Sequence, residues 1–160
     1  MNDMIKDALV IVDMQGYFST AKDKATIKNV KSLIREFREK NLPIIVLEYY
    51  YPTENLGHTL PCLTKLLDDY YFTRYVRKSD DDGGREVIKC LRDNGWEIKN
   101  FTVCGVNLGA CVRETVWTLT YTYHKHIKVV KKACNGFSSR RDAFNRNKDF
   151  YTNTPNLAVV

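Results

Sequence analysis

The chain has 160 residues, 44% of them hydrophobic, and a formal net charge of +6 at pH 7. This length predicts a single domain, residues 1–160, with one hydrophobic core. No apolar run of 18 residues and no basic-then-apolar leader occurs, which argues against contact with a membrane and against secretion. Five cysteines without a CxxC pair argue against a disulfide framework, so a reducing, cytoplasmic compartment is expected.

Short apolar runs alternate with amphipathic stretches along the whole chain. In chain order, the predicted elements are a strand at 8–12, a helix at 22–40, a strand at 42–47, a helix at 60–69, a strand at 71–77, a turn and helix N-cap at 80–84, a helix from there through 91, a strand at 101–106, a helix at 110–123, a strand at 127–130, a helix at 139–146 and an edge strand or loose tail at 157–160. This alternation is typical of an α/β fold with a parallel sheet. We therefore predict a three-layer Rossmann-like sandwich. Its sheet is mostly parallel, with five or six strands in the order 3-2-1-4-5-6 and helices on both faces.

Three residues with reactive side chains follow predicted strands. Asp13 follows the first strand, Lys78 follows the third, and Cys111 begins the helix after the fourth. Parallel strands place their carboxyl ends at one edge of the sheet, so the three residues are predicted to lie together. A carboxylate that accepts the thiol proton and an ammonium that favours the thiolate would support nucleophilic hydrolysis.

Each of these residues also has a purely structural interpretation. Asp13 could form a turn after its strand, Lys78 is one of 25 basic residues, and a free cysteine is often a small buried hydrophobe. The position of Cys111 at a helix N-terminus favours chemistry, because the helix dipole can lower the pKa of a thiol there. The unpaired N–H groups of the same turn could stabilise a developing oxyanion.

Three motifs resemble those of the isochorismatase-like cysteine hydrolases, a superfamily that includes nicotinamidases and N-carbamoylsarcosine amidohydrolases. They are residues 8–15 (ALVIVDMQ), 77–79 (RKS) and 105–112 (GVNLGACV). The resemblance implies that Asp13, Lys78 and Cys111 form a catalytic triad and that Phe18 lines the substrate pocket. It also implies a cis peptide between Val106 and Asn107, with the backbone at Asn107 binding the substrate oxygen. Members of the superfamily commonly form homo-oligomers, which is the expectation here as well.

The chain departs from the nicotinamidases at their metal-binding D-x-H-P motif. The corresponding stretch here is 49–52 (YYYP), with only Glu48 and His58 nearby as metal-ligand types. Two ligands are too few for a metal site, so neither a metal nor another cofactor is predicted, and His58 is interpreted as a surface-loop residue. Hydrolysis of a C–N bond in a small amide, ureido or imide-like substrate is favoured, and acceptance of nicotinamide is left open.

A different class of function stays open beside the hydrolase. Residues 124–148 contain eight Lys or Arg and one acidic residue, Asp142. Such a stretch could bind a phosphate-bearing partner or nucleic acid on a non-catalytic protein of the same fold. A solvated basic face is the simpler interpretation, so nucleic acid is not the favoured partner. Cys111 as a redox sensor is a third alternative, but the sequence indicates no resolving cysteine near it.

Overall fold

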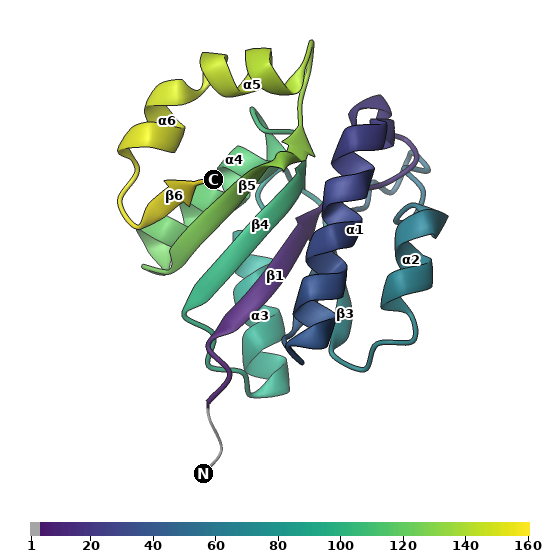
Figure 1. The fold of residues 1–160 in the computed structure, drawn as a ribbon, viewed down its shortest axis with the longest axis vertical. Coiled ribbons are helices and arrows are strands. Elements are labelled where there is room, and N and C mark those ends of the chain that lie inside the picture. Colours follow the sequence, from purple (N-terminus) through teal and green to yellow (C-terminus); the bar gives the residue numbers. More distant parts are fainter. Residues whose placement is uncertain (1–3) are drawn as a thin grey trace.

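The computed structural model describes residues 4–160, which form an α/β sandwich around a six-stranded sheet (Figure 1). All pairings are parallel, and the strand order is β3-β2-β1-β4-β5-β6. The strands are β1 (Asp7–Val12), β2 (Ile44–Tyr49), β3 (Thr73–Lys78), β4 (Asn100–Val106), β5 (His126–Asn135) and β6 (Leu157–Val159). The predicted fold class and strand order are confirmed.

Helices cover both faces of this sheet. They are η1 (Ser19–Lys22), α1 (Lys24–Glu39), α2 (Pro61–Leu67), α3 (Gly84–Asn94), α4 (Cys111–Trp117), η2 (Thr118–Thr122), α5 (Arg140–Arg146) and α6 (Lys148–Asn153). Figure 1 shows α1 and α2 on one face, α3 and α4 on the other, and α5 and α6 beyond the end of β5. Within residues 4–160, the helices are too short or too polar for any of them to cross a membrane.

The hydrophobic pattern explains the core. In β1 the five residues 8–12 are completely buried, as expected for a central parallel strand that is covered on both faces. Helix α1 buries Val30, Ile34 and Phe37 on one side, while charged residues occupy its exposed side. Asp23 caps this helix, because its carboxylate accepts a hydrogen bond of 2.8 Å from the Thr26 N–H.

The structure differs from the predicted elements mainly after Cys111. The helix predicted for 110–123 is α-helical only to Trp117 and continues as the π-helical turn η2. Strand β5 extends to Asn135, well beyond the predicted 127–130, because Lys131 and Lys132 lie where the pairing with β4 shifts register, and the strand continues after them with the buried Ala133 and Cys134. Helix α6 was not predicted, because its six residues are too few for a clear hydrophobic period.

Gly105 allows β1 and β4 to approach closely where both strands reach the site. Its φ is +116°, and a Cβ atom at this position would lie 2.1 Å from the carbonyl oxygen of Val12. We expect Gly105→Ala to lower the free energy of unfolding by about 3 kcal/mol or more, because the energy cost of the positive φ adds to the cost of the clash between the new Cβ and the Val12 backbone. The matched control is Gly16→Ala, where a Cβ meets nothing within 4 Å. Urea denaturation should show a change of at most about 0.5 kcal/mol for this control; equal losses in both variants would contradict the explanation.

Candidate active site

The structure brings the predicted Asp13 and Lys78 into direct contact at the carboxyl edge of the sheet. Asp13 follows β1 and Lys78 ends β3, with β2 between them. The Lys78 side chain crosses the end of β2, and its Nζ lies 3.0 Å from Asp13 Oδ2 and 4.1 Å from the centroid of the Tyr49 ring. Both charged side chains are almost fully buried, so water screens their attraction little.

The second oxygen of Asp13 is unpaired. Within residues 4–160, Asp13 Oδ1 is the one buried side-chain N or O atom without a hydrogen-bond partner. Burial raises the pKa of the Asp13 carboxyl, while the charge of Lys78 and the neighbouring Cys111 thiol oppose this rise. A raised pKa brings the carboxylate closer to the range in which a general base works near neutral pH.

Cys111 is the first residue of α4, and it lies beside this ion pair. Its side chain is buried, and Sγ is 3.7 Å from Oδ1 of Asp81. Burial raises the pKa of the thiol and the negative charge of Asp13 raises it further, while Lys78 opposes both effects. The pKa lowering expected from the helix N-terminus is therefore wrong for this structure: α4 has only seven residues, and desolvation outweighs its dipole. The thiol keeps its proton until a base removes it.

The turn before Cys111 contains two backbone N–H groups without an acceptor within residues 4–160. The peptide bond between Val106 and Asn107 is cis, as the resemblance implied. The Asn107 carbonyl accepts hydrogen bonds from the N–H groups of Ala110 and Val112, and its side-chain oxygen accepts one of 2.6 Å from Thr20 Oγ1. Within residues 4–160, the N–H groups of Asn107 and Cys111 donate no hydrogen bond. Two free N–H groups beside a thiol can bind an oxyanion. The Val106 side chain is buried in the core, so only its backbone can take part.

Phe18 lies half-buried in the segment that follows Asp13. Its ring centroid is 5.5 Å from that of Tyr17 and 6.5 Å from that of Tyr49. Tyr49 in turn faces the Lys78 ammonium. Phe18 thus lies near the aromatic ring that faces the ion pair, and its position in a substrate pocket stays a prediction.

Two polar residues at the site received no role from the sequence. Gln15, buried two residues after Asp13, donates hydrogen bonds to the carbonyls of Tyr49 (3.0 Å) and Gly57 (2.9 Å) and accepts one of 2.6 Å from the Tyr49 N–H. It therefore ties the end of β1 to the loop after β2. The signal in the sequence was its position as the last residue of the motif 8–15. Asp81 faces the thiol, although the run 80–82 had suggested only a turn and a helix cap.

The residues at the end of β2 and in the loop after it do not fit a metal. Glu48 Oε2 already accepts two hydrogen bonds from Thr59, and the exposed His58 lies with Nδ1 3.7 Å from Glu48 Oε1. In the part of the chain that the structure describes, no three His, Cys, Asp or Glu side chains gather as a metal would require.

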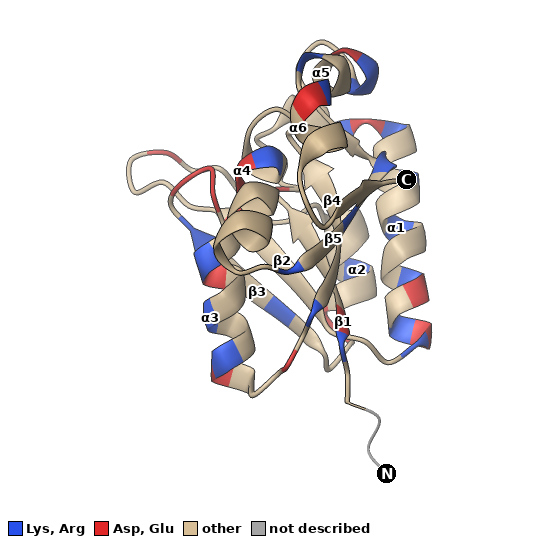
Figure 2. Cartoon of the chain, turned by 90° about the vertical axis from the view of Figure 1, so that its left-hand side faces the viewer, with Lys and Arg blue, Asp and Glu red and all other residues tan. Residues whose placement is uncertain are grey.

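The basic stretch 124–148 does not form one continuous charged face. Lys125 donates to the Ile98 carbonyl, Lys131 lies over the Phe144 ring, and Arg140 pairs with Asp23. Figure 2 shows Lys and Arg spread over several helices and strands, with acidic residues among them. This dispersion favours the interpretation of these residues as ordinary solvated charges.

Comparison with known proteins gives a consistent family and fold. Residues 7–153 match the family model described as "Isochorismatase domain". The fold resembles a nicotinamidase from Staphylococcus aureus (19% identity, TM-score 0.78, 96% of each chain covered). It also resembles an N-carbamoylsarcosine amidase from Thermoplasma acidophilum (22% identity, TM-score 0.70, 88% of this chain and 91% of that chain covered). A further similar structure is the MAR1 ribonuclease from Caenorhabditis elegans (23% identity, TM-score 0.77, 98% of this chain and 77% of that chain covered). The search of curated proteins found no match.

Proposed function

Because the chain belongs to the isochorismatase family of hydrolases, we propose that it is a metal-independent cysteine hydrolase that cleaves a C–N bond in a small amide, ureido or imide-like substrate. Asp13, Lys78 and Cys111 would be the catalytic residues. The observation that carries this proposal is the buried Asp13–Lys78 pair, with one carboxylate oxygen unpaired and a cysteine thiol beside it. Such an arrangement keeps a proton acceptor and a counter-charge ready for the thiol.

The first half of the reaction forms a thioester. Asp13 takes the proton from the Cys111 thiol while Sγ attacks the carbonyl carbon, and the carbonyl π electrons move to oxygen. The N–H groups of Asn107 and Cys111 would bind this oxyanion. Asp13 then gives the proton to the substrate nitrogen, the C–N bond breaks, and ammonia or an amine leaves. Lys78 stabilises the negative charge as it moves between Asp13 and the sulfur.

The second half returns the enzyme to its starting state. Asp13 removes a proton from a water molecule, whose oxygen attacks the thioester carbon and forms a second oxyanion in the same place. When this intermediate collapses, the C–S bond breaks and the carboxylic acid leaves. The proton on Asp13 passes to the sulfur, so the thiol and the carboxylate are restored. The raised pKa of the thiol is consistent with this final step.

Release of ammonia from primary amides and N-carbamoyl compounds tests this function, and so does the ring opening of cyclic imides, measured as formation of the half-amide acid because no ammonia leaves in that case. Intact-protein mass spectrometry of samples quenched in acid should show an acyl adduct on Cys111 with at least one active substrate. Activity without such an adduct, under conditions in which deacylation limits the rate, would count against the thioester. A chain that hydrolyses none of these compounds would refute the proposed substrate class.

The reaction should also depend on pH through Asp13. The carboxyl must be ionised to accept the thiol proton, and burial raises its pKa above the ordinary 3.8. For a neutral amide, kcat/KM is therefore expected to rise with pH, with an acid-side inflection above 3.8, because this parameter reports on groups of the free enzyme. Circular dichroism at each pH separates this effect from unfolding. If kcat/KM did not change with pH on the acid side above pH 3.8, Asp13 would be excluded as the base.

The remaining expectations extend this proposal. All five cysteines are free thiols in the structure, which suits a reducing cytoplasm. A homo-oligomer is proposed from the family alone, and size-exclusion chromatography with light scattering would test it.

A further inference from the structure

Asp81 is a second carboxylate beside the thiol of Cys111, and the proposed reaction gives it no task. Its Oδ1 lies 3.7 Å from the Cys111 Sγ. Asp81 is exposed, whereas Cys111 and the ion pair of Asp13 and Lys78 are buried. Asp81 therefore lies at the boundary between the buried thiol and the solvent.

The backbone on both sides of Asp81 is anchored to the site. On one side, the Lys78 ammonium donates a hydrogen bond of 2.9 Å to the carbonyl of Asp80. On the other side, the Asp82 carboxylate accepts a hydrogen bond of 2.6 Å from Thr118 Oγ1, on the helical turn η2 that continues α4. These two anchored neighbours hold Asp81 beside the thiol.

No cation compensates the charge of Asp81 at close range. In the described part of the chain, no Lys, Arg or His side chain lies within 4.0 Å of its carboxylate. The ammonium of Lys78 is paired with Asp13, so these two charges cancel. The thiol of Cys111 therefore lies in a negative field, which agrees with its raised pKa: burial is the main cause of the rise, and Asp81 adds to it.

Every substrate must enter this field. In a complex that is ready to react, the carbonyl carbon lies about 3–3.5 Å from the nucleophile, so it comes within about 7 Å of Asp81 Oδ1 by whatever route it arrives. This separation is shorter than the Debye length of about 8 Å at physiological ionic strength. A negative charge next to the reacting carbonyl is therefore repelled by Asp81, whereas a neutral group is not.

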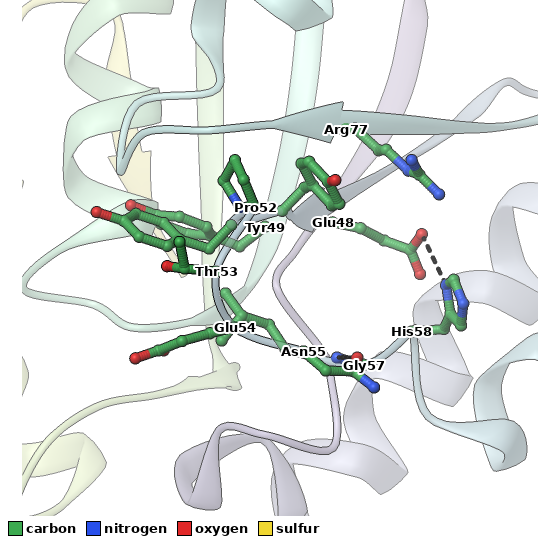
Figure 3. Close-up of a pocket in the computed structure, with 12 residues that line it drawn as sticks. Glu48, Tyr49, Pro52, Thr53, Glu54, Asn55, Gly57, His58 and Arg77 are labelled. Atoms are coloured by element: carbon green, nitrogen blue, oxygen red, sulfur yellow. Dashed lines mark hydrogen bonds and ion pairs between the residues drawn. The ribbon is translucent and has the colours of Figure 1, made fainter.

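Glu48, a further buried carboxylate at this edge of the sheet, does not share the position of Asp81. It pairs in register with Arg77, so its side chain faces away from Lys78, the next residue of β3. It lines a cavity of about 360 Å³ between the end of β2 and the loop 50–58 (Figure 3). Glu48 thus faces away from the thiol, and Asp81 faces it.

We propose that Asp81 is a specificity-determining residue that disfavours substrates with a negative charge beside the scissile carbonyl. This inference rests on the proposed hydrolase function and narrows its substrates to compounds without an anionic group at that position. The same repulsion acts on the product, because hydrolysis leaves a carboxylate at the carbon that Sγ attacked. Asp81 would thus favour release of the product and weaken inhibition by it.

Alkylation of Cys111 tests the effect of charge without any substrate. Iodoacetamide and iodoacetate have the same leaving group and nearly the same size, but at neutral pH the first is neutral and the second is an anion. In both reactions the thiolate displaces iodide and forms an S–C bond, so the ratio of the two rate constants does not depend on the fraction of thiolate. Mass spectrometry of the Cys111 peptide gives this ratio, and N-acetylcysteinamide gives the ratio for a free thiol. We expect Cys111 to favour iodoacetamide at least about tenfold more than the free thiol does at low ionic strength, and less as salt is added.

Substitutions then assign this preference to a named residue. Asp81→Asn keeps the shape of the side chain and removes its charge, so the excess preference for iodoacetamide should fall about tenfold, to near the value of the free thiol. The matched control is Glu97→Gln, which removes the same charge from an exposed position before β4, at the opposite edge of the sheet. It should leave the ratio unchanged.

Turnover provides the second test and separates this inference from the proposed function. The wild type should hydrolyse malonamide, which is neutral, with a kcat/KM at least about tenfold above that for the anion malonamate, and Asp81→Asn should narrow this gap. Equal kcat/KM for the two amides, or a preference for iodoacetamide that survives Asp81→Asn, would overturn the role of Asp81 and leave the hydrolase standing. A chain with the charge-dependent alkylation that hydrolyses no amide would refute the hydrolase, but not the effect of Asp81 on the thiol.

Discussion

Replacing Cys111 by alanine should abolish hydrolysis, with a loss in kcat of about 10⁶-fold, the size seen when a catalytic nucleophile is removed. The variant keeps the Asp13–Lys78 pair, but no remaining side chain can form the acyl intermediate. The free energy of unfolding should change by about 1 kcal/mol or less, because one small buried sulfur is removed. Ammonia release and the loss of the acyl adduct in mass spectra would measure the effect on catalysis, and urea denaturation would measure the effect on stability.

Cys90→Ala is the matched control for this experiment. Cys90 is also a buried free thiol whose pKa is raised mainly by burial, but it lies on α3 and contacts Asn94 there, away from the carboxyl edge of the sheet. Its replacement should cost similar stability and leave kcat unchanged. Comparable turnover in the wild type and Cys111→Ala, or equal loss of activity in both cysteine variants, would refute the nucleophile.

The sequence predicted the architecture well because the pattern of buried strands is strong. The run 8–12 is fully buried in β1, and the strand order follows the predicted 3-2-1-4-5-6. Errors arose where local patterns are weak or where packing overrides them. The lysines of β5 seemed to end a strand that continues to Asn135, and the short α6 has no clear period.

The candidate site was partly predictable for a related reason. Strand ends marked Asp13 and Lys78, and the structure places these two 3.0 Å apart. Burial depends on the whole fold, so the sequence misjudged its effect: the helix N-terminus suggested a lowered thiol pKa for Cys111, whereas desolvation raises it. Contacts made by exposed loops cannot be predicted from local sequence either. The run 80–82 therefore indicated only a turn and a helix cap, and not that Asp81 lies beside the thiol.

Replacing Lys78 by methionine should cost both activity and stability, and the stability loss should grow with pH. Without the ammonium, Asp13 remains buried without a counter-charge, an effect of about 3–5 kcal/mol when the carboxylate is ionised. Its pKa then rises further, because Lys78 is the main group that opposes the effect of burial. The folded chain keeps a proton that the unfolded chain loses near pH 3.8, so stability is greatest below that pH and falls as pH rises through the folded-state pKa. Urea denaturation at pH 5 and pH 8 measures the difference, which amounts to about 1.4 kcal/mol for each pH unit in which one extra proton is bound.

The double variant Asp13→Asn with Lys78→Met separates the two losses. It removes both buried charges at nearly constant volume, so its stability should return to the wild-type level or exceed it by about 1–4 kcal/mol and should depend less on pH. It should remain inactive, because neither a proton acceptor nor a counter-charge is left for the thiol of Cys111. A double variant as unstable as Lys78→Met would show that packing, rather than uncompensated charge, causes the loss. If the double variant were active, the Asp13–Lys78 pair would not be needed for catalysis. The expected combination, a stable fold without turnover, would show that this buried pair is retained for catalysis at the expense of stability.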